Sequence, residues 1–250
     1  MNIDFHTHGN LSKKIPVTVE EFIEKMEEAK QNGLTAIALT EHFNAMNFFE
    51  LYEMLDRHFE YRKNYYMVNG VKVFPGIEID VKEIGHFLVV GDREDIKAIR
   101  RKLSDHLEEA DFLPVRELID LLHPYDVLKI GAHPFRESTP WTHHEEDVLT
   151  QFDAFDINGK DLHKYGLAMK QRVEELAEQF GTSAVGGSDT HQLLQYGSVV
   201  NEFPDCETIQ DLKGVIRRGD YAVFISPAID TKVKAAKMVK NLLKKEYVAL

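Results

Sequence analysis

The chain opens with Asn2-Ile3-Asp4-Phe5-His6-Thr7-His8, a short apolar run that ends in two histidines. Residues two apart on a strand project to the same face, about 6 to 7 Å apart, so both rings of a His-x-His can approach one cation. On its own this is a weak signal, because isolated strand histidines are mostly structural or surface residues. The stretch gains meaning only if other strands of the chain end in the same way.

Four other apolar runs of the chain also end in residues that can bind metal. They end in Thr40-Glu41-His42, Gly76-Ile77-Glu78, Ala132-His133-Pro134 and Ser188-Asp189-Thr190-His191. In a parallel barrel, side chains at the carboxyl ends of different strands meet at one face, although they are far apart in sequence. We therefore expect one site in which His, Asp and Glu bind divalent metal ions.

Glu78 and His86 each have a second possible role. Glu78 ends a run, residues 73–77, that is apolar or turn-forming, and a buried carboxylate there is costly unless it is paired or bound to metal. A salt bridge is the other interpretation. His86 begins an apolar run, residues 86–90, and alone it fits a core histidine bonded to the backbone.

Short runs rich in β-branched and aromatic residues alternate with helical patterns, which is typical of α/β proteins with a mainly parallel sheet. We expect strands at residues 2–8, 35–40, 72–79, 85–90, 127–132, 154–157 and 183–187. Helical patterns occupy residues 19–32, 48–59, 94–109, 114–122, 145–151, 162–180 and 209–217, and residues 60–70 fit either helix or loop. Thr18, Glu21 and Gly33 predict a capping box and a C-terminal glycine for the first helix.

The pattern predicts a single domain over residues 1–228, followed by a C-terminal helix over residues 229–250 that packs on it. This last helix carries six lysines between Lys232 and Lys245. Its helical period predicts that it packs four apolar side chains inward, which are Val233, Met238, Leu242 and Leu243.

Composition limits the class of protein and of partner. The single cysteine, Cys206, excludes an internal disulfide and a cysteine-based zinc site, and agrees with a reducing compartment. No signal-peptide or membrane-span pattern is present in the sequence, so we expect a cytoplasmic protein. A formal net charge of −12 works against binding the phosphate backbone of duplex nucleic acid and favours a small substrate.

Taken together, these motifs resemble the PHP family, which is named for its polymerase and histidinol phosphatase members. They follow the family's order and are Asp4-Phe5-His6-Thr7-His8, Leu39-Thr40-Glu41-His42, Pro75-Gly76-Ile77-Glu78-Ile79, Gly85-His86-Phe87-Leu88, Gly131-Ala132-His133-Pro134-Phe135 and Gly187-Ser188-Asp189-Thr190-His191. The resemblance implies a distorted (β/α)7 barrel, similar to a TIM barrel, that holds a metal cluster.

The resemblance also implies how the ligands divide among two or three divalent transition metal ions, zinc, manganese or iron. The first metal would be bound by His6, His8, Glu78 and Asp189, the second by Glu78, His86 and His133, and the third by His42 and His191 with a residue shortly after the first motif. Relatives often have Ser-Asp-Gly at that point, whereas this chain has Ser12-Lys13-Lys14. Either Asn10 or a water substitutes, or two metals bind and a lysine contacts the substrate phosphate.

For the reaction, the resemblance implies that a metal-bound hydroxide hydrolyses a small phosphomonoester. Asp189 or His191 would handle protons, and Arg136 would hold the phosphate, although an arginine at a strand end is often a surface ion-pair partner. Asn158 and Lys160 follow the sixth expected strand and either contact substrate or form an ordinary turn.

Three alternatives remain open at the level of sequence. The first is phosphodiester cleavage of the exonuclease type, and the second is a non-catalytic PHP module that binds metal or a small ligand. The third, hydrolysis of a C–N bond, would need a bridging lysine after a central strand, as in barrel amidohydrolases, and the chain has none there. The sequence leaves the oligomeric state open.

Overall fold

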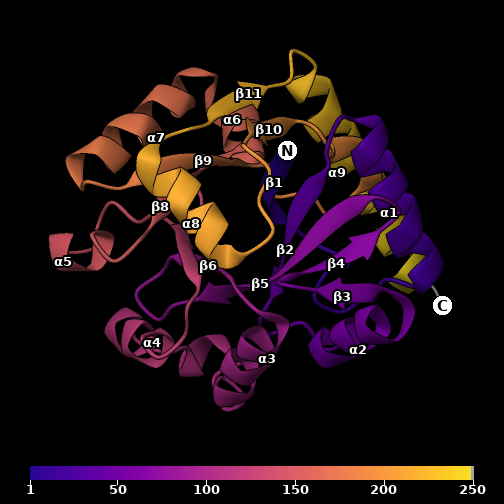
Figure 1. Cartoon of the computed structure of the whole chain (residues 1–250), viewed down its shortest axis with the longest axis horizontal. Coiled ribbons are helices and arrows are strands. Elements are labelled where there is room, and N and C mark those ends of the chain that lie inside the picture. Colours follow the sequence, from indigo (N-terminus) through magenta and orange to yellow (C-terminus); the bar gives the residue numbers. More distant parts are fainter. Residues whose placement is uncertain (249–250) are drawn as a thin grey trace.

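The computed structural model describes residues 1–248, in which a single curled sheet forms a nearly closed barrel with helices around it (Figure 1). The strands are β1 (Asn2–Thr7), β2 (Ala36–His42), β3 (Glu60–Arg62), β4 (Tyr65–Val68), β5 (Val71–Asp80), β6 (His86–Val90), β7 (Leu128–Gly131), β8 (Ala154–Asn158), β9 (Ser183–Gly187), β10 (Val199–Glu202) and β11 (Ala222–Ile225). The helices are α1 (Val19–Gln31), α2 (Phe48–His58), α3 (Arg93–Lys102), η1 (Glu109–Asp111), α4 (Val115–Leu122), α5 (Glu146–Leu149), α6 (Gly159–Tyr165), α7 (Ala168–Gln179), η2 (Leu193–Gln195), α8 (Ile209–Arg218) and α9 (Ile229–Val248). The predicted α/β barrel is confirmed.

The strand order explains how the barrel closes. Along the sheet the strands follow the order β11-β10-β1-β2-β5-β6-β7-β8-β9. Beyond the end of β9 the chain returns to β1, where His8 N donates to Thr190 O at 2.9 Å and Asp189 N donates to His6 O at 2.8 Å. β10 pairs antiparallel with the other part of β1, Asn2 opposite Glu202. The barrel is therefore closed at the end where the histidines lie.

β6 runs against its neighbours, since it pairs antiparallel with both β5 and β7. Asp80, at the end of β5, lies opposite His86, at the start of β6. The amino end of β6 thus lies at the same barrel end as the carboxyl ends of the parallel strands. This reversal gives His86 access to the site although it begins a strand.

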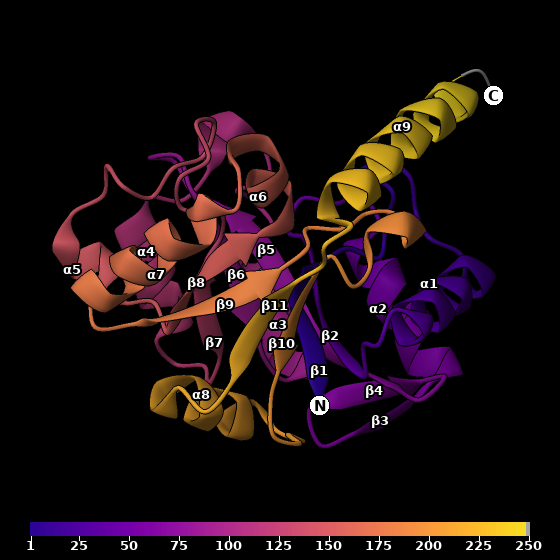
Figure 2. The same cartoon turned by 90° about the horizontal axis from the view of Figure 1, so that it is seen from above.

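The interior of the barrel is apolar at one end and polar at the other. Phe5, Phe74, Leu88 and Ile130 belong to one buried cluster, which also includes Leu212 of α8. α8 covers the barrel end opposite α6 and α9 (Figure 2). Side chains on one face of a strand recur every two residues, so Glu78 shares the inward face of β5 with Phe74.

The first helix follows the sequence closely. The Thr18 side chain accepts from Glu21 N and the Glu21 side chain accepts from Thr18 N, which is the predicted capping box. Gly33 has φ +84°, a conformation that glycine adopts without strain, and it ends the helix as predicted. The buried face of α1 carries Phe22 and Met26.

Three local predictions are wrong and one was incomplete. The helix predicted over residues 94–109 ends at Lys102 as α3. Residues 60–70 form neither helix nor loop but the hairpin of β3 and β4, which turns at Lys63 with φ +53°. The helix predicted over residues 162–180 is divided into α6 and α7 at Gly166, where φ is +92°. β10 and β11 were not predicted, because their short runs have little apolar alternation.

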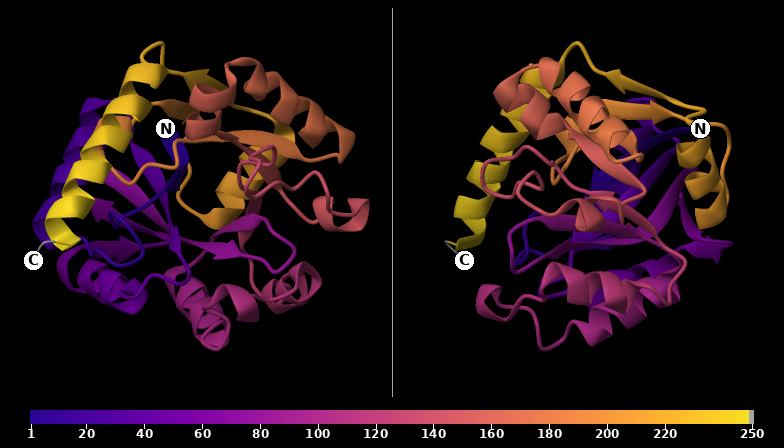
Figure 3. Two further views of the ribbon diagram at one scale, coloured as in Figure 1. Left: turned by 180° about the vertical axis from the view of Figure 1, so that it is seen from behind. Right: turned by 90° about the vertical axis from the view of Figure 1, so that its left-hand side faces the viewer.

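The C-terminal helix begins at Ile229, and its first turns lie on the barrel. Lys232 Nζ donates to Tyr196 O at 2.9 Å, and Val233 and Ala236 are buried. The helix then projects away from the body (Figure 2) on the side that carries α1 (Figure 3).

The inward packing predicted for the rest of this helix is wrong for two residues. Met238 and Leu242 are each 60% exposed, because they lie on the face of the helix opposite Val233 and Ala236, and Leu243 is half-buried. The last two residues of the predicted helix, 249 and 250, lie outside the described residues. Within residues 1–248, no helix is both long and apolar enough to cross a membrane.

Candidate metal centre

His6 and His8 face a pair of carboxylates from distant strands. His6 Nε2 lies 3.7 Å from Glu78 Oε1 and 3.8 Å from Asp189 Oδ1. His8 Nε2 lies 3.4 Å from Glu78 Oε2 and 3.6 Å from Asp189 Oδ1. Ligand atoms of a tetrahedral zinc site with bonds of about 2.0 to 2.2 Å are roughly 3.3 to 3.6 Å apart. The four side chains therefore fit one metal ion.

A second group shares Glu78. His86 Nδ1 lies 2.7 Å from Glu78 Oε1, and His133 Nε2 lies 3.6 Å from the same oxygen. Oε2 of Glu78 faces His8 and His42, whereas Oε1 faces His86 and His133 and also His6, so the carboxylate lies between the groups of histidines. This is the arrangement that a bridging carboxylate requires.

A third group consists of His8, His42 and His191, whose ligand atoms lie within 4.8 Å of one another. His42 Nε2 and His191 Nε2 are 3.4 Å apart. Asn10 is not placed to complete this group, because its amide oxygen accepts from Val17 N at 3.1 Å and from the amide of Asn47. The site thus offers a third ligand set without a residue from the loop after His8.

Several nitrogens of these rings are buried and free of hydrogen bonds. Among residues 1–248, no hydrogen-bond partner meets His6 Nε2, His133 Nε2 or either ring nitrogen of His8. Buried polar atoms are almost always paired, and leaving one unpaired costs about 1 to 3 kcal/mol. Metal ions at the three groups would satisfy these atoms, so the residues present fit the cofactors that the sequence predicts.

Two of the same residues have an unusual backbone conformation. His133 has φ +35° and Asp189 has φ +55°, in the left-handed region that residues other than glycine adopt in only a few per cent of cases. Such outliers cluster at functional sites, where the surrounding structure holds them. Here they aim His133 and Asp189 at the other ligand-type side chains.

The charges of the buried carboxylates favour binding of a cation in the site. Burial opposes protonation of His6, yet Asp189 and Glu78 raise its pKa to about 10. Burial also opposes ionisation of Glu78, yet the charges of His42 and His86 lower its pKa well below the usual range. For Asp189, burial is likewise outweighed, chiefly by Lys160, and the pKa is lowered. Both carboxylates are therefore ionised at neutral pH.

Carboxylates behind the ligands were missed by the sequence interpretation. Asp156 Oδ2 lies 2.9 Å from His6 Nδ1, and Asn158 Nδ2 donates to the same Asp156 oxygen at 2.8 Å. Glu41 is fully buried and accepts from Asn10 N and His42 N at 2.9 and 3.0 Å. The only signal for Asp156 was its spacing of two from Asn158 at the end of an apolar strand.

Arg136 and Lys160 lie beside Asp189. Both terminal nitrogens of Arg136 donate to Asp189 Oδ2 at 3.2 Å, and Lys160 Nζ donates to Asp189 Oδ1 at 2.6 Å. Arg136 Nε also donates to Asp161 Oδ1, and Nη2 to Asn158 Oδ1. Asn158 caps α6 by accepting from Lys160 N at 3.0 Å. The predicted substrate residues Arg136, Asn158 and Lys160 are thus brought together.

Lys13 and Lys14, which follow the first motif, do not join Arg136 and Lys160 beside Asp189. Lys13 Nζ donates to Asp80 Oδ2 at 3.1 Å, and Asp80 Oδ1 lies 3.0 Å from His86 Nε2. Lys14 is exposed. Lys13 therefore lies near the His86 side of the site, whereas Arg136 and Lys160 lie near Asp189.

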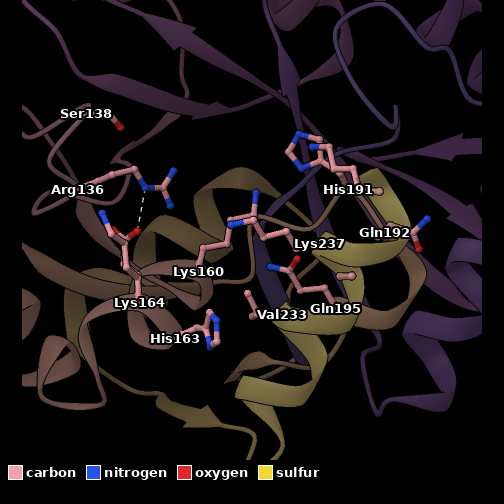
Figure 4. A pocket seen from close by; sticks show the side chains of 13 residues that line it. Arg136, Ser138, Lys160, His163, Lys164, His191, Gln192, Gln195, Val233 and Lys237 are labelled. Carbon is pink, nitrogen blue, oxygen red and sulfur yellow. Dashed lines mark hydrogen bonds and ion pairs between the residues drawn. The ribbon is translucent and has the colours of Figure 1, made fainter. Parts of the chain in front are cut away.

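A cavity of about 540 Å³ opens beside Asp189 and is lined by His191, Arg136 and Lys160 (Figure 4). A volume in this range suits a small molecule. A ligand in the cavity would lie next to His191 and to the two cations that contact Asp189.

Comparisons with known proteins agree with this geometry. The family model described as PHP domain matches residues 4–185, and the one described as PHP-associated matches residues 170–221. No curated protein sequence matches the chain.

Solved structures share the fold at low sequence identity. PsfC from Pseudomonas syringae has a TM-score of 0.80 and 22% identity, covering 97% of this chain and 98% of that chain. The lesion-specific endonuclease Q from Pyrococcus furiosus has a TM-score of 0.66 and 19% identity, covering 89% of this chain but 58% of the endonuclease. An amidohydrolase from Chromobacterium violaceum has a TM-score of 0.55 and 15% identity over 91% of this chain and 99% of that chain.

Proposed function

The chain belongs to the PHP domain family, and on this premise we propose that it is a metal-dependent hydrolase of small phosphomonoesters. The observation that carries the proposal is the position of Arg136 and Lys160. Both residues donate hydrogen bonds to Asp189 and also line the cavity. A phosphoryl group that enters the cavity meets these cationic side chains together with His191, the proposed metal ligand that lines it.

The proposed metal ligands are those of the three groups described above, which are His6, His8, His42, Glu78, His86, His133, Asp189 and His191. Divalent cations bound there would lower the pKa of a water molecule and neutralise charge on a transferring phosphoryl group. Mixed nitrogen and oxygen ligands suit zinc, manganese and iron.

The side chains around the cavity would bind and orient the phosphate. Arg136 is buried by four-fifths, and its guanidinium is fixed by Asp161, Asn158 and Asp189, which leaves one Nη1–H to donate to a phosphoryl oxygen. Lys160 reaches the cavity as a second positive charge. Asp189, held ionised, is the group to which we assign the proton of the attacking water.

The first test is metal content. We expect elemental analysis of protein purified without chelators to give at least two transition-metal equivalents per chain. Glu78→Gln should lose more than one equivalent, because the two Glu78 oxygens face two groups of histidines. Glu53→Gln, an exposed position on α2, is the matched control and should keep its metal. Protein that is folded but holds no stoichiometric metal would refute the cluster.

The second test separates the kinds of hydrolysis. Each metal-loaded form is assayed with p-nitrophenyl phosphate, a monoester, and bis(p-nitrophenyl) phosphate, a diester. We expect turnover of the monoester, lost in a His6→Ala/His8→Ala variant. Preference for the diester would favour the phosphodiesterase alternative, which the fold likeness to endonuclease Q supports. Turnover of neither ester would favour a non-catalytic binding module.

A further inference from the structure

One wall of the cavity comes from the C-terminal helix. Val233, Ala236, Lys237 and Lys240 of α9 line it, and Figure 4 shows Val233 and Lys237 on the side away from Arg136. The start of α9 is held against α6, since His163 Nδ1 lies 2.7 Å from Asp230 Oδ1. Lys237 and Lys240 therefore line the same cavity as the proposed metal ligand His191.

The cavity has more positive charge than its own acid can neutralise. Its lining includes five cationic side chains, which are Arg136, Lys160, Lys164, Lys237 and Lys240. The acid among the lining residues, Asp161, accepts from Arg136 Nε at 2.8 Å, and Lys160 is paired with Asp189. Within the side chains of residues 1–245, no carboxylate forms an ion pair with Lys237 or Lys240. These two charges are left for a ligand.

Lys240 lies near another positive charge of the cavity. Burial and the nearby charge of Lys160 lower its pKa to about 7. Lys240 and His191 line the same cavity, so an anion that binds beside His191 lies within reach of this lysine.

We propose that α9 makes the enzyme selective for small phosphomonoesters that carry a second anionic group, a carboxylate or another phosphate, which Lys237 and Lys240 bind. The inference rests on the proposed phosphoester hydrolysis at the same site. Arg136 and Lys160 bind the phosphoryl group next to the metal ligands, and the α9 lysines bind the second anion across the cavity. α9 lies beyond both family matches, which end at residues 185 and 221, so selectivity comes from a part of the chain outside them.

The test compares pairs of substrates that differ by one anionic group. Glycerol 3-phosphate is paired with 3-phosphoglycerate for the carboxylate, and glucose 6-phosphate with glucose 1,6-bisphosphate for the phosphate. We expect the wild type to show a kcat/KM at least about tenfold higher for the second member of one pair, and that pair identifies the anion. In Lys237→Gln/Lys240→Gln the ratio within that pair should fall toward one, mainly through KM.

Lys234→Gln is the matched control, because Lys234 is exposed on the same helix and does not line the cavity. It should keep the wild-type ratio, and circular dichroism and metal content should be unchanged in all variants. Equal kcat/KM within both pairs, or a ratio that survives the double substitution, would overturn the inference.

A binding measurement separates this inference from the proposed function. If the wild type hydrolyses neither p-nitrophenyl phosphate nor any of the four esters, the proposed function fails, and calorimetric titration with both pairs then tests the α9 wall alone. Tighter binding of the second member of one pair, abolished by the double substitution, supports the wall. Equal binding within both pairs by wild type overturns it.

Discussion

The Asp156 carboxylate determines how His6 faces the metal groups, because it receives the Nδ1 side of the ring at 2.9 Å. Such carboxylates fix the tautomer of a ligand histidine, and their loss lowers metal affinity about 10- to 100-fold. We expect Asp156→Asn to lower metal affinity by this amount, measured by competition with a chromogenic chelator. Asp153→Asn, just before the other end of β8, is the control. Equal affinities in the two variants would contradict the assignment.

Lys13 and Lys14 give a second matched pair. Lys13 pairs with Asp80, which in turn contacts His86, whereas Lys14 is exposed. We expect Lys13→Ala to reduce the phosphatase rate up to about fivefold, since partly exposed ion pairs contribute about 0 to 1 kcal/mol. Lys14→Ala should leave the rate unchanged. A larger loss from Lys14→Ala than from Lys13→Ala, in steady-state assays at equal metal content, would reverse these roles.

The residues most visible in the sequence were those with a local signature. His6 and His8 could be selected by their spacing, and Glu78 by its charge in an apolar run. Asp156 could not be assigned its role, because it meets His6 only when the barrel closes and brings β8 and β9 beside β1. The cavity beside Asp189 could not be predicted from the sequence either, because its lining residues come from separate segments of the chain.

Among the elements, β6 shows why strand positions were easier to predict than strand direction. Its apolar run was placed within one residue, yet the period-two pattern of a strand is the same in both directions. The hydrogen-bonded register of β5 and β6 reveals the reversal. His86 lies at the site because β6 is reversed, and this reversal could not be predicted from the sequence.

The packing of α9 can be tested by truncating one buried and one exposed side chain. Val233 is 5% exposed and Met238 is 60% exposed on the same helix. We expect Val233→Ala to destabilise the protein by about 1 to 2 kcal/mol, because it removes two buried methyl groups. Met238→Ala should change stability by less than about 0.5 kcal/mol. Both are measured by urea unfolding, and equal losses would mean that Met238 is covered in solution.

The same helix shows that its four apolar residues do not share one face. At about 3.6 residues per turn, Met238 and Leu242 lie on the side opposite Val233, so all four could not point inward. The structure accordingly buries Val233 and Ala236 and exposes Met238 and Leu242.

For the molecule as a whole, the metal groups connect strands from nearly the entire barrel. Their side chains come from β1, β2, β5 and β6 and from the segments after β7 and β9. Because metal binds the folded site far better than the unfolded chain, a chelator should lower the melting temperature by about 5 to 10 °C. Differential scanning fluorimetry checks this, with recovery on adding zinc or manganese. A His6→Ala/His8→Ala variant should respond much less, and an unchanged melting temperature of metal-containing wild type would contradict the expectation.

The closure of the sheet has a consequence for the order of folding. β1 is synthesised first, but its antiparallel neighbour β10 follows almost the whole barrel, with Asn2 opposite Glu202. Until that partner leaves the ribosome, one edge of β1 keeps unpaired backbone groups, and such edges attract other chains. Contacts between the two ends of a chain also form slowly. We therefore expect chaperone dependence during synthesis, and a refolding rate limited by the late docking of β10 on β1.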